Sequence, residues 1–131
     1  MARDYKLRRE VVEELAALVG GLGDLVDLVL VEGRRDRERL EAWGCRAPIA
    51  TLGPLGVGEA EQAEMLASKC SRLLILTDFD EKGRALNSRF SRLLEGRVCV
   101  DHGLRARFGR LMGELRVRAV EDLGGGFERG G

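Results

Sequence analysis

Four short apolar runs, separated by segments of helical length, constrain the fold of this chain more than any other feature. The runs are rich in aliphatic residues, many of them β-branched, and cover residues 25–31, 48–52, 73–77 and 97–100. Between and around them, charged amphipathic stretches predict helices at residues 4–19, 35–43, 59–69, 81–94 and 104–115. Because this alternation is typical of βαβ units, we expect an α/β fold with a four-stranded, mainly parallel sheet flanked by helices.

The length of 131 residues suits one domain with a proper core. We expect an N-terminal helix in residues 1–23, followed by the α/β domain and a C-terminal helical extension in residues 24–123. The pattern of residues 117–123 assigns no clear secondary structure. The glycine-rich end, residues 124–131, is expected to be a flexible tail.

Composition narrows the class of protein. Hydrophobic residues make up 44% of the chain and charged residues 34%, which is typical of a globular protein. No apolar run approaches the ~20 residues of a membrane span, and the N-terminus lacks the apolar core of a signal peptide. We therefore expect a cytoplasmic protein. The spacing of Cys45, Cys70 and Cys99 forms no C-x-x-C pair and favours buried free thiols.

Acidic residues follow two of the apolar runs at the point where each run ends. Glu32 and Gly33 close the first run, and Asp78-Phe79-Asp80 closes the third. In a parallel sheet, the carboxyl ends of neighbouring strands meet at one edge, where ligands bind. Carboxylates gathered there repel one another unless a cation holds them. Hard oxygen ligands of this kind suit Mg²⁺ or Mn²⁺, the ions of phosphate chemistry.

These motifs resemble those of the Toprim domain. The resemblance rests on Val31-Glu32-Gly33, Asp36, Thr77-Asp78-Phe79-Asp80 and Gly83, and it covers roughly residues 24–100. It implies a Rossmann-like three-layer fold. Topoisomerases, bacterial primases, recombination-repair proteins and the ribonuclease that matures 5S ribosomal RNA share this domain, as do small stand-alone Toprim proteins.

The resemblance also implies roles for the three acids. Asp78 and Asp80 would hold Mg²⁺ or Mn²⁺, and Glu32 would act as a general acid/base or as a carboxylate next to the metal. Position 82 is a lysine, whereas topoisomerases carry a third acid there. Topoisomerases also carry a catalytic tyrosine in a partner domain, and the only tyrosine of this chain, Tyr5, lies in the predicted N-terminal helix. These departures favour the primase, repair and ribonuclease branches over topoisomerase chemistry.

Four further residues are candidates for substrate binding, each with a structural alternative. Gly33 and Gly83 would let the backbone approach phosphate or make sharp turns. Asp36 would either face the same cleft or cap its helix, where a first-turn acid complements the helix dipole. Lys82 would contact phosphate or lie on a solvated surface.

The basic residues leave a similar choice open. The chain has no net formal charge, but residues 103–118 hold five arginines and one acid, Glu114, a balance of 5 − 1 = +4. Arg105, Arg107 and Arg110 would bind a nucleic-acid backbone or form a solvated helix face. His102 would carry protons or simply begin a helix.

We therefore expect a Mg²⁺-dependent Toprim protein that acts on phosphodiester bonds of RNA or DNA, and within this class a small nuclease of the ribonuclease-like branch. The alternative is a non-catalytic nucleic-acid-binding subunit of a processing, replication or repair complex. A nucleotide-binding protein ranks last, because no glycine-rich phosphate-binding motif follows a strand. A homodimer or a partner in a processing complex is compatible with the small size.

Overall fold

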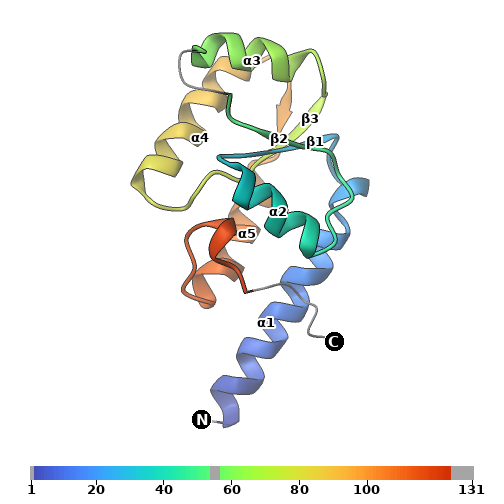
Figure 1. Cartoon of the computed structure of the whole chain (residues 1–131), viewed down its shortest axis with the longest axis vertical. Helices are drawn as coiled ribbons and strands as arrows, with labels where there is room; N and C mark the ends of the chain where they lie inside the picture. The colour runs from blue at the N-terminus through green and yellow to red at the C-terminus, as the bar shows by residue number, and fades with distance from the viewer. Residues whose placement is uncertain (1, 54–56, 125–131) are drawn as a thin grey trace.

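A four-stranded parallel sheet forms the centre of the molecule (Figure 1). The computed structural model describes residues 2–53 and 57–124. The strand order is β2-β1-β3-β4, and every pair in it is parallel. The strands are β1 (Leu28–Val31), β2 (Ile49–Thr51), β3 (Arg72–Ile75) and β4 (Cys99–Val100). The predicted α/β architecture is confirmed.

In the described residues, five α-helices and two short 3₁₀ turns surround the sheet. The helices are α1 (Ala2–Gly20), α2 (Arg34–Ala42), α3 (Glu59–Ala67), α4 (Glu81–Leu94) and α5 (His102–Glu114). The 3₁₀ turns are η1 (Leu22–Asp24) and η2 (Val120–Asp122), and η2 lies in the stretch to which the sequence assigned no structure. Within residues 2–53 and 57–124, no helix is both long and apolar enough to cross a membrane.

Each face of the sheet has its own apolar core. Val29 and Val31 point to the face covered by α1, α2 and α5, whereas Leu28 and Leu30 point to the face covered by α3 and α4. All four side chains are buried. A strand buried on both faces requires an unbroken apolar run instead of an alternating one, which explains the composition of residues 28–31.

The chain leaves the two central strands towards opposite faces. From β1 it continues into α2, whose Leu40 packs in the core shared with α1 and α5. From β3 it continues into α4, whose Phe90 packs in the core shared with α3. Ligands of open α/β sheets bind at such a switch point. We use the word crevice for this place, the carboxyl ends of β1 and β3.

The segment after α5 returns to this edge of the sheet. The Arg118 carbonyl accepts a hydrogen bond from the Phe79 amide, and the Gly124 carbonyl accepts one from the Trp43 indole. The predicted flexible tail, residues 124–131, lies outside the described residues except for Gly124. Arg118 is thus held beside the carboxyl end of β3, and Gly124 is held at the C-terminal end of α2.

Among the described residues the three cysteines are free thiols, as expected. Cys45 and Cys70 are half-buried. Cys99 is exposed, so the expectation of a buried thiol is wrong at this position. The reason is that Cys99 lies in β4, an edge strand of only two residues.

Candidate acidic site at the carboxyl ends of β1 and β3

Glu32 and Asp78 lie side by side at the crevice. The last backbone bond between their strands runs from the Leu76 amide to the Leu30 carbonyl. One step further, the Glu32 carboxylate accepts the Asp78 amide through Oε2 at 2.8 Å. The Glu32 side chain thereby continues the hydrogen-bond ladder between β1 and β3 beyond the end of β1. The two acidic motifs of the sequence are brought together by this bond.

Asp80 begins α4 as its N-cap residue. Its Oδ1 accepts the Gly83 amide at 2.7 Å, and the Thr77 hydroxyl donates to the Gly83 carbonyl at 2.7 Å. A side chain at Gly83 would collide with the backbone of Asp78. Glycine is therefore required here, because the first turn of α4 packs directly on the chain that carries the acids.

Asp36 is buried, with 1% of its surface exposed. Its Oδ2 accepts the Gly33 amide at 3.1 Å and caps α2, which was one of the two roles expected for it. Its Oδ1 accepts the Glu121 amide at 2.9 Å. Burial raises the pKa of Asp36, and these backbone hydrogen bonds oppose the increase. Asp36 thus links the start of α2 to the C-terminal segment.

Asp78 differs from the other acids of the site. Its carboxylate is half-buried and accepts no hydrogen bond from any described residue. Burial, followed by repulsion from the carboxylates of Glu32, Asp36, Asp80 and Glu121, raises the pKa of Asp78 to about 7. The site therefore holds an excess of negative charge that a cation would relieve.

The donor chemistry fits a hydrated Mg²⁺ ion, which takes one or two carboxylates and keeps several waters. In the part of the chain that the structure describes, however, no three acidic, histidine or cysteine side chains lie close enough together to hold a metal ion. The set of Glu32, Asp78 and Asp80 is consequently not preassembled as three ligands. Their roles as metal ligands remain predictions.

Glu121 belongs to this site but was not a sequence candidate. It lies in η2, and its charge acts on Asp78. The hydrogen bond that places it joins residues 85 positions apart. The only local signal was the pair of acids Glu121-Asp122 in a stretch without clear periodicity, which gives no hint of a distant contact.

Arg105 requires a correction. Only 7% of its surface is exposed, so it does not belong to a solvated helix face. Its guanidinium donates to main-chain carbonyls at the end of β3 and lies over the Phe79 ring, 4.3 Å from the ring centre. A buried guanidinium with these contacts is not available to phosphate, and we withdraw the expectation that Arg105 binds substrate.

The other basic candidates are accessible. Lys82 is exposed in the first turn of α4, and Arg107 is exposed on α5 with its guanidinium 3.7 Å from the Glu14 carboxylate. His102 is exposed at the start of α5. For these three residues a role in substrate binding or proton transfer remains a prediction.

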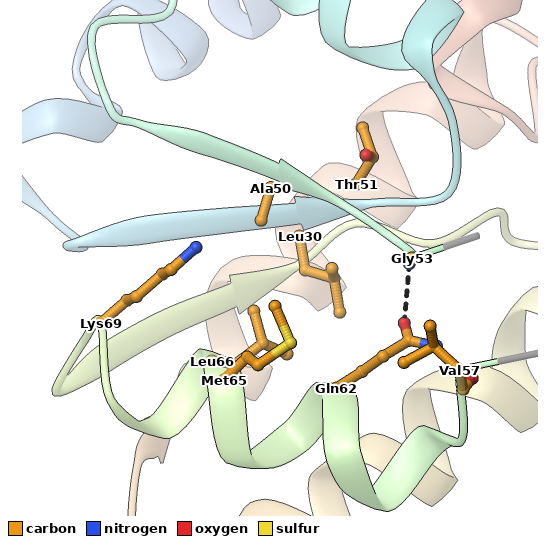
Figure 2. Close-up of a pocket in the computed structure, with 9 residues that line it drawn as sticks. All are labelled: Leu30, Ala50, Thr51, Gly53, Val57, Gln62, Met65, Leu66 and Lys69. Carbon is orange, nitrogen blue, oxygen red and sulfur yellow. Dashed lines mark hydrogen bonds between the residues drawn. The ribbon is translucent and has the colours of Figure 1, made fainter.

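An apolar cavity of about 120 Å³ lies elsewhere, between α3 and the strands β1 and β2 (Figure 2). Gln62 lies at the edge of the cavity. Its side chain accepts a hydrogen bond from the Gly53 amide at 2.8 Å and donates one to the Val57 carbonyl at 2.9 Å. Among the described residues that line it, Lys69 is the only titratable one. Because the described residues of its lining include no carboxylate, we place the acidic chemistry at the crevice instead.

This chain is similar to a known family model, to proteins of two archaea and to a solved structure. The family model described as Toprim domain matches residues 27–111. The UPF0292 proteins of Thermococcus gammatolerans and Thermococcus onnurineus are 35% and 34% identical over 125 residues, which are 95% of this chain and 86% of each relative. A solved structure from Aquifex aeolicus has a TM-score of 0.66 at 20% identity, covers 85% of this chain and 96% of that one, and shows the same fold.

Proposed function

Because this chain belongs to the Toprim domain family, we propose that it is a Mg²⁺- or Mn²⁺-dependent nuclease of the ribonuclease-like branch. Family membership alone indicates the coarser function, which is metal binding in nucleic-acid chemistry. The observation that carries the finer proposal is the state of Asp78. This half-buried carboxylate accepts no hydrogen bond from the described residues and lies in the field of four other acids. Strongly perturbed groups in a crevice are typical of functional sites.

In this proposal Asp78 and Asp80 hold the metal ion. The ion would supply charge neutralisation at the phosphate and lower the pKa of a coordinated water. Asp80 keeps its N-cap bond to the Gly83 amide through one oxygen, so its second oxygen is the one proposed for the metal. Such an arrangement keeps the carboxylate oriented while it binds.

Glu32 is proposed as the residue that moves a proton. Its Oε2 accepts the Asp78 amide, which holds the carboxylate beside the metal-binding acids. A carboxylate fixed in this way can take a proton from an attacking water or return one to a leaving oxygen. Its distance from the reacting atoms depends on the substrate.

Substrate would be held by groups around the crevice. At Gly33 an added Cβ would have no neighbour within 4 Å, so the backbone at the start of α2 is open to an approaching phosphate. Lys82 and Arg107 are exposed cations that we propose as phosphate contacts. Because these contacts are electrostatic, binding should weaken as salt rises.

The test is a panel of end-labelled single- and double-stranded RNA and DNA, incubated with increasing Mg²⁺ or Mn²⁺. Wild type is compared with Asp78→Asn, and Asp27→Asn at the opposite end of the sheet serves as the control. The proposal predicts metal-dependent products with wild type and the control but not with Asp78→Asn. Equal cleavage by Asp78→Asn would reject it.

A second candidate is a non-catalytic nucleic-acid-binding subunit. It is favoured by the lack of a preassembled three-ligand metal site among the described residues. In the same panel it predicts salt-dependent binding without cleavage under either ion. In both cases we propose a cytoplasmic location, with which the free thiols of the described chain are compatible.

A further inference from the structure

The end of β3 extends beyond its neighbour β4. On the side of β3 that faces β4, the final backbone hydrogen bond runs from the Asp101 amide to the Leu73 carbonyl. Because alternate residues of a strand face the same neighbour, the next carbonyls on this side belong to Ile75 and Thr77. Among the described residues no strand is present there to supply donors, since β4 ends at Val100. Buried carbonyls without donors would be costly.

Arg105 supplies these donors from α5. Its Nη1 donates to the Ile75 carbonyl at 3.0 Å and to the Thr77 carbonyl at 2.9 Å, and its Nη2 donates to the Asp78 carbonyl at 3.2 Å. The planar fork of a guanidinium can serve several acceptors at fixed angles. One side chain therefore replaces the missing strand.

The two sides of β3 are completed in a complementary way. The peptide group between Thr77 and Asp78 offers its amide to the Glu32 carboxylate and its carbonyl to the Arg105 guanidinium. An acid and a base thus hold one peptide plane from opposite edges. Both bonds are charge-assisted and hence stronger than ordinary backbone bonds. The Asp78 side chain projects from the next backbone atom.

Phe79, the residue after Asp78, is held by the same helix, α5. Its ring lies against the Arg105 guanidinium on one side and against α5 on another, where a Cβ at Gly109 would come within 2.8 Å of the ring. Its amide donates to the Arg118 carbonyl at 2.7 Å. The residues on both sides of the Asp78 carboxylate are consequently fixed by α5 and the segment that follows it.

We propose that Arg105 is a positioning residue for Asp78. By clamping the Thr77–Asp78 peptide against Glu32, it sets the direction in which the Asp78 carboxylate leaves the chain. The proposal rests on the proposed metal-dependent function, for which that direction matters. It assigns to the C-terminal helix a role inside the acidic site, where the sequence left a choice between a nucleic-acid contact and a solvated helix face.

Two possible roles of Arg105 predict different results. If it acted only as a positive charge near the carboxylates, its removal would raise the affinity for a divalent cation. If it positions Asp78, its replacement lowers cation affinity and loosens the backbone at Asp78 while leaving the other end of β3 unchanged.

The experiment compares wild type with Arg105→Lys and Arg105→Met in the full-length chain. Arg110→Met, an exposed arginine of the same helix, is the matched control. Mn²⁺ affinity is measured by calorimetry above the pKa of Asp78, at about pH 8. Hydrogen exchange of the Asp78 amide is measured by NMR, with the Leu74 amide as the internal reference.

We expect Arg105→Lys to keep the charge but lose the fork, so Mn²⁺ affinity falls about 10- to 100-fold, the range seen when a ligand-orienting partner is removed. The Asp78 amide should exchange at least about tenfold faster, with Leu74 and the Arg110→Met control unchanged. Unchanged exchange at Asp78, or equal acceleration at Leu74, would overturn the proposal. Higher Mn²⁺ affinity in Arg105→Met would also overturn it.

Failure of the two proposals can be told apart. If wild type binds no Mn²⁺, the proposed metal-dependent function is wrong, and the exchange of the Asp78 amide still decides whether Arg105 clamps this peptide. If Arg105→Met does not fold, Arg105→Lys decides, because lysine retains the charge and one possible hydrogen bond.

Discussion

The two ends of the central sheet give a carboxylate opposite environments. At the amino end, Asp27 is exposed and its Oδ2 accepts the amides of Ser71 and Arg72, each at 2.9 Å, which lowers its pKa. At the carboxyl end, Asp78 is half-buried among other acids, and its pKa is raised to about 7. Both residues lie where β1 and β3 meet.

The difference separates an acid that supports the fold from one that opposes it. Ionised Asp27 joins two strands through hydrogen bonds that its charge strengthens. Ionised Asp78 gains no such bond from the described residues and repels its neighbours. Natural proteins retain an unfavourable charge mainly where function needs it. This contrast is the physical basis for placing the function at the carboxyl end.

The largest expected effect on stability concerns Gly83. In Gly83→Ala the new Cβ would collide with the Asp78 backbone, which has no flexible atom to move aside. We expect a loss of about 3 kcal/mol or more in the free energy of unfolding, measured by urea denaturation. Gly113→Ala on α5 is the control, since nothing lies within 4 Å of its Cβ. Equal stability of the two variants would show that the carboxyl end is not packed as described.

The pH dependence of stability tests the contrast between Asp78 and Asp27 directly. Between about pH 4 and pH 7 the folded chain keeps a proton on Asp78 that the unfolded chain has lost, so stability falls as pH rises through this window. Asp78→Asn should remove this fall and be more stable than wild type above pH 7. Thermal unfolding at a series of pH values measures both.

For Asp27 the sign is reversed. Its lowered pKa means that its contribution is present above its ordinary value of 3.8 and is lost as pH falls below it. Asp27→Ala should therefore lower the melting temperature at neutral pH and make less difference in acid. If Asp27→Ala and Asp78→Asn shifted stability in the same direction at neutral pH, the distinction between the two ends would fail.

Two substitutions of Asp80, with a smaller expected effect on stability, separate its role as a helix cap from its proposed role as a metal ligand. Asparagine caps helices about as well as aspartate, so Asp80→Asn should keep the stability of α4 while removing the charge proposed for the metal. Asp80→Ala should lose the cap as well, at a cost of about 1 kcal/mol. Chemical denaturation measures the stability, and the nuclease panel measures activity. Retained cleavage in Asp80→Asn would remove Asp80 from the proposed metal ligands.

The smallest effect is a gain in stability away from both ends of the sheet. Arg116 has φ 62° at the end of α5, where the Val117 amide bonds back to the Met112 carbonyl. This helix ending favours glycine. Arg116→Gly should relieve the strain but increase the freedom of the unfolded chain, for a net gain of about 0.5 kcal/mol. A melting temperature below that of wild type would contradict this.

Most of the fold could be predicted from the sequence because its signals are local. The apolar runs locate all four strands, and helices α2 to α4 begin within one residue of the prediction. The errors are at the ends of strands and helices: α1 and α5 each begin two residues before the prediction. Val26 and Val98 are buried and apolar like strand residues, but each belongs to a turn, bonding back to Leu22 and Leu94.

The site could be predicted only in part, for the same reason. Glu32, Asp78 and Asp80 follow strands, so their meeting depends only on the neighbourhood of β1 and β3. Arg105 contacts a carbonyl 30 residues away, and Glu121 contacts Asp36 across 85 residues. No local pattern contains such contacts. Because Arg105 stands among other arginines in the sequence, an exposed position was expected for it, although it is buried in the site.

Direct titration of Mn²⁺ into the protein at about pH 8, where Asp78 is ionised, tests most directly whether the carboxyl end of the sheet is a metal site. Three proteins are compared by calorimetry: wild type, Asp78→Asn and Asp27→Asn. We predict that wild type and Asp27→Asn bind the ion with equal affinity and that Asp78→Asn does not bind it. Equal binding by Asp78→Asn, or no binding by wild type, would contradict the assignment.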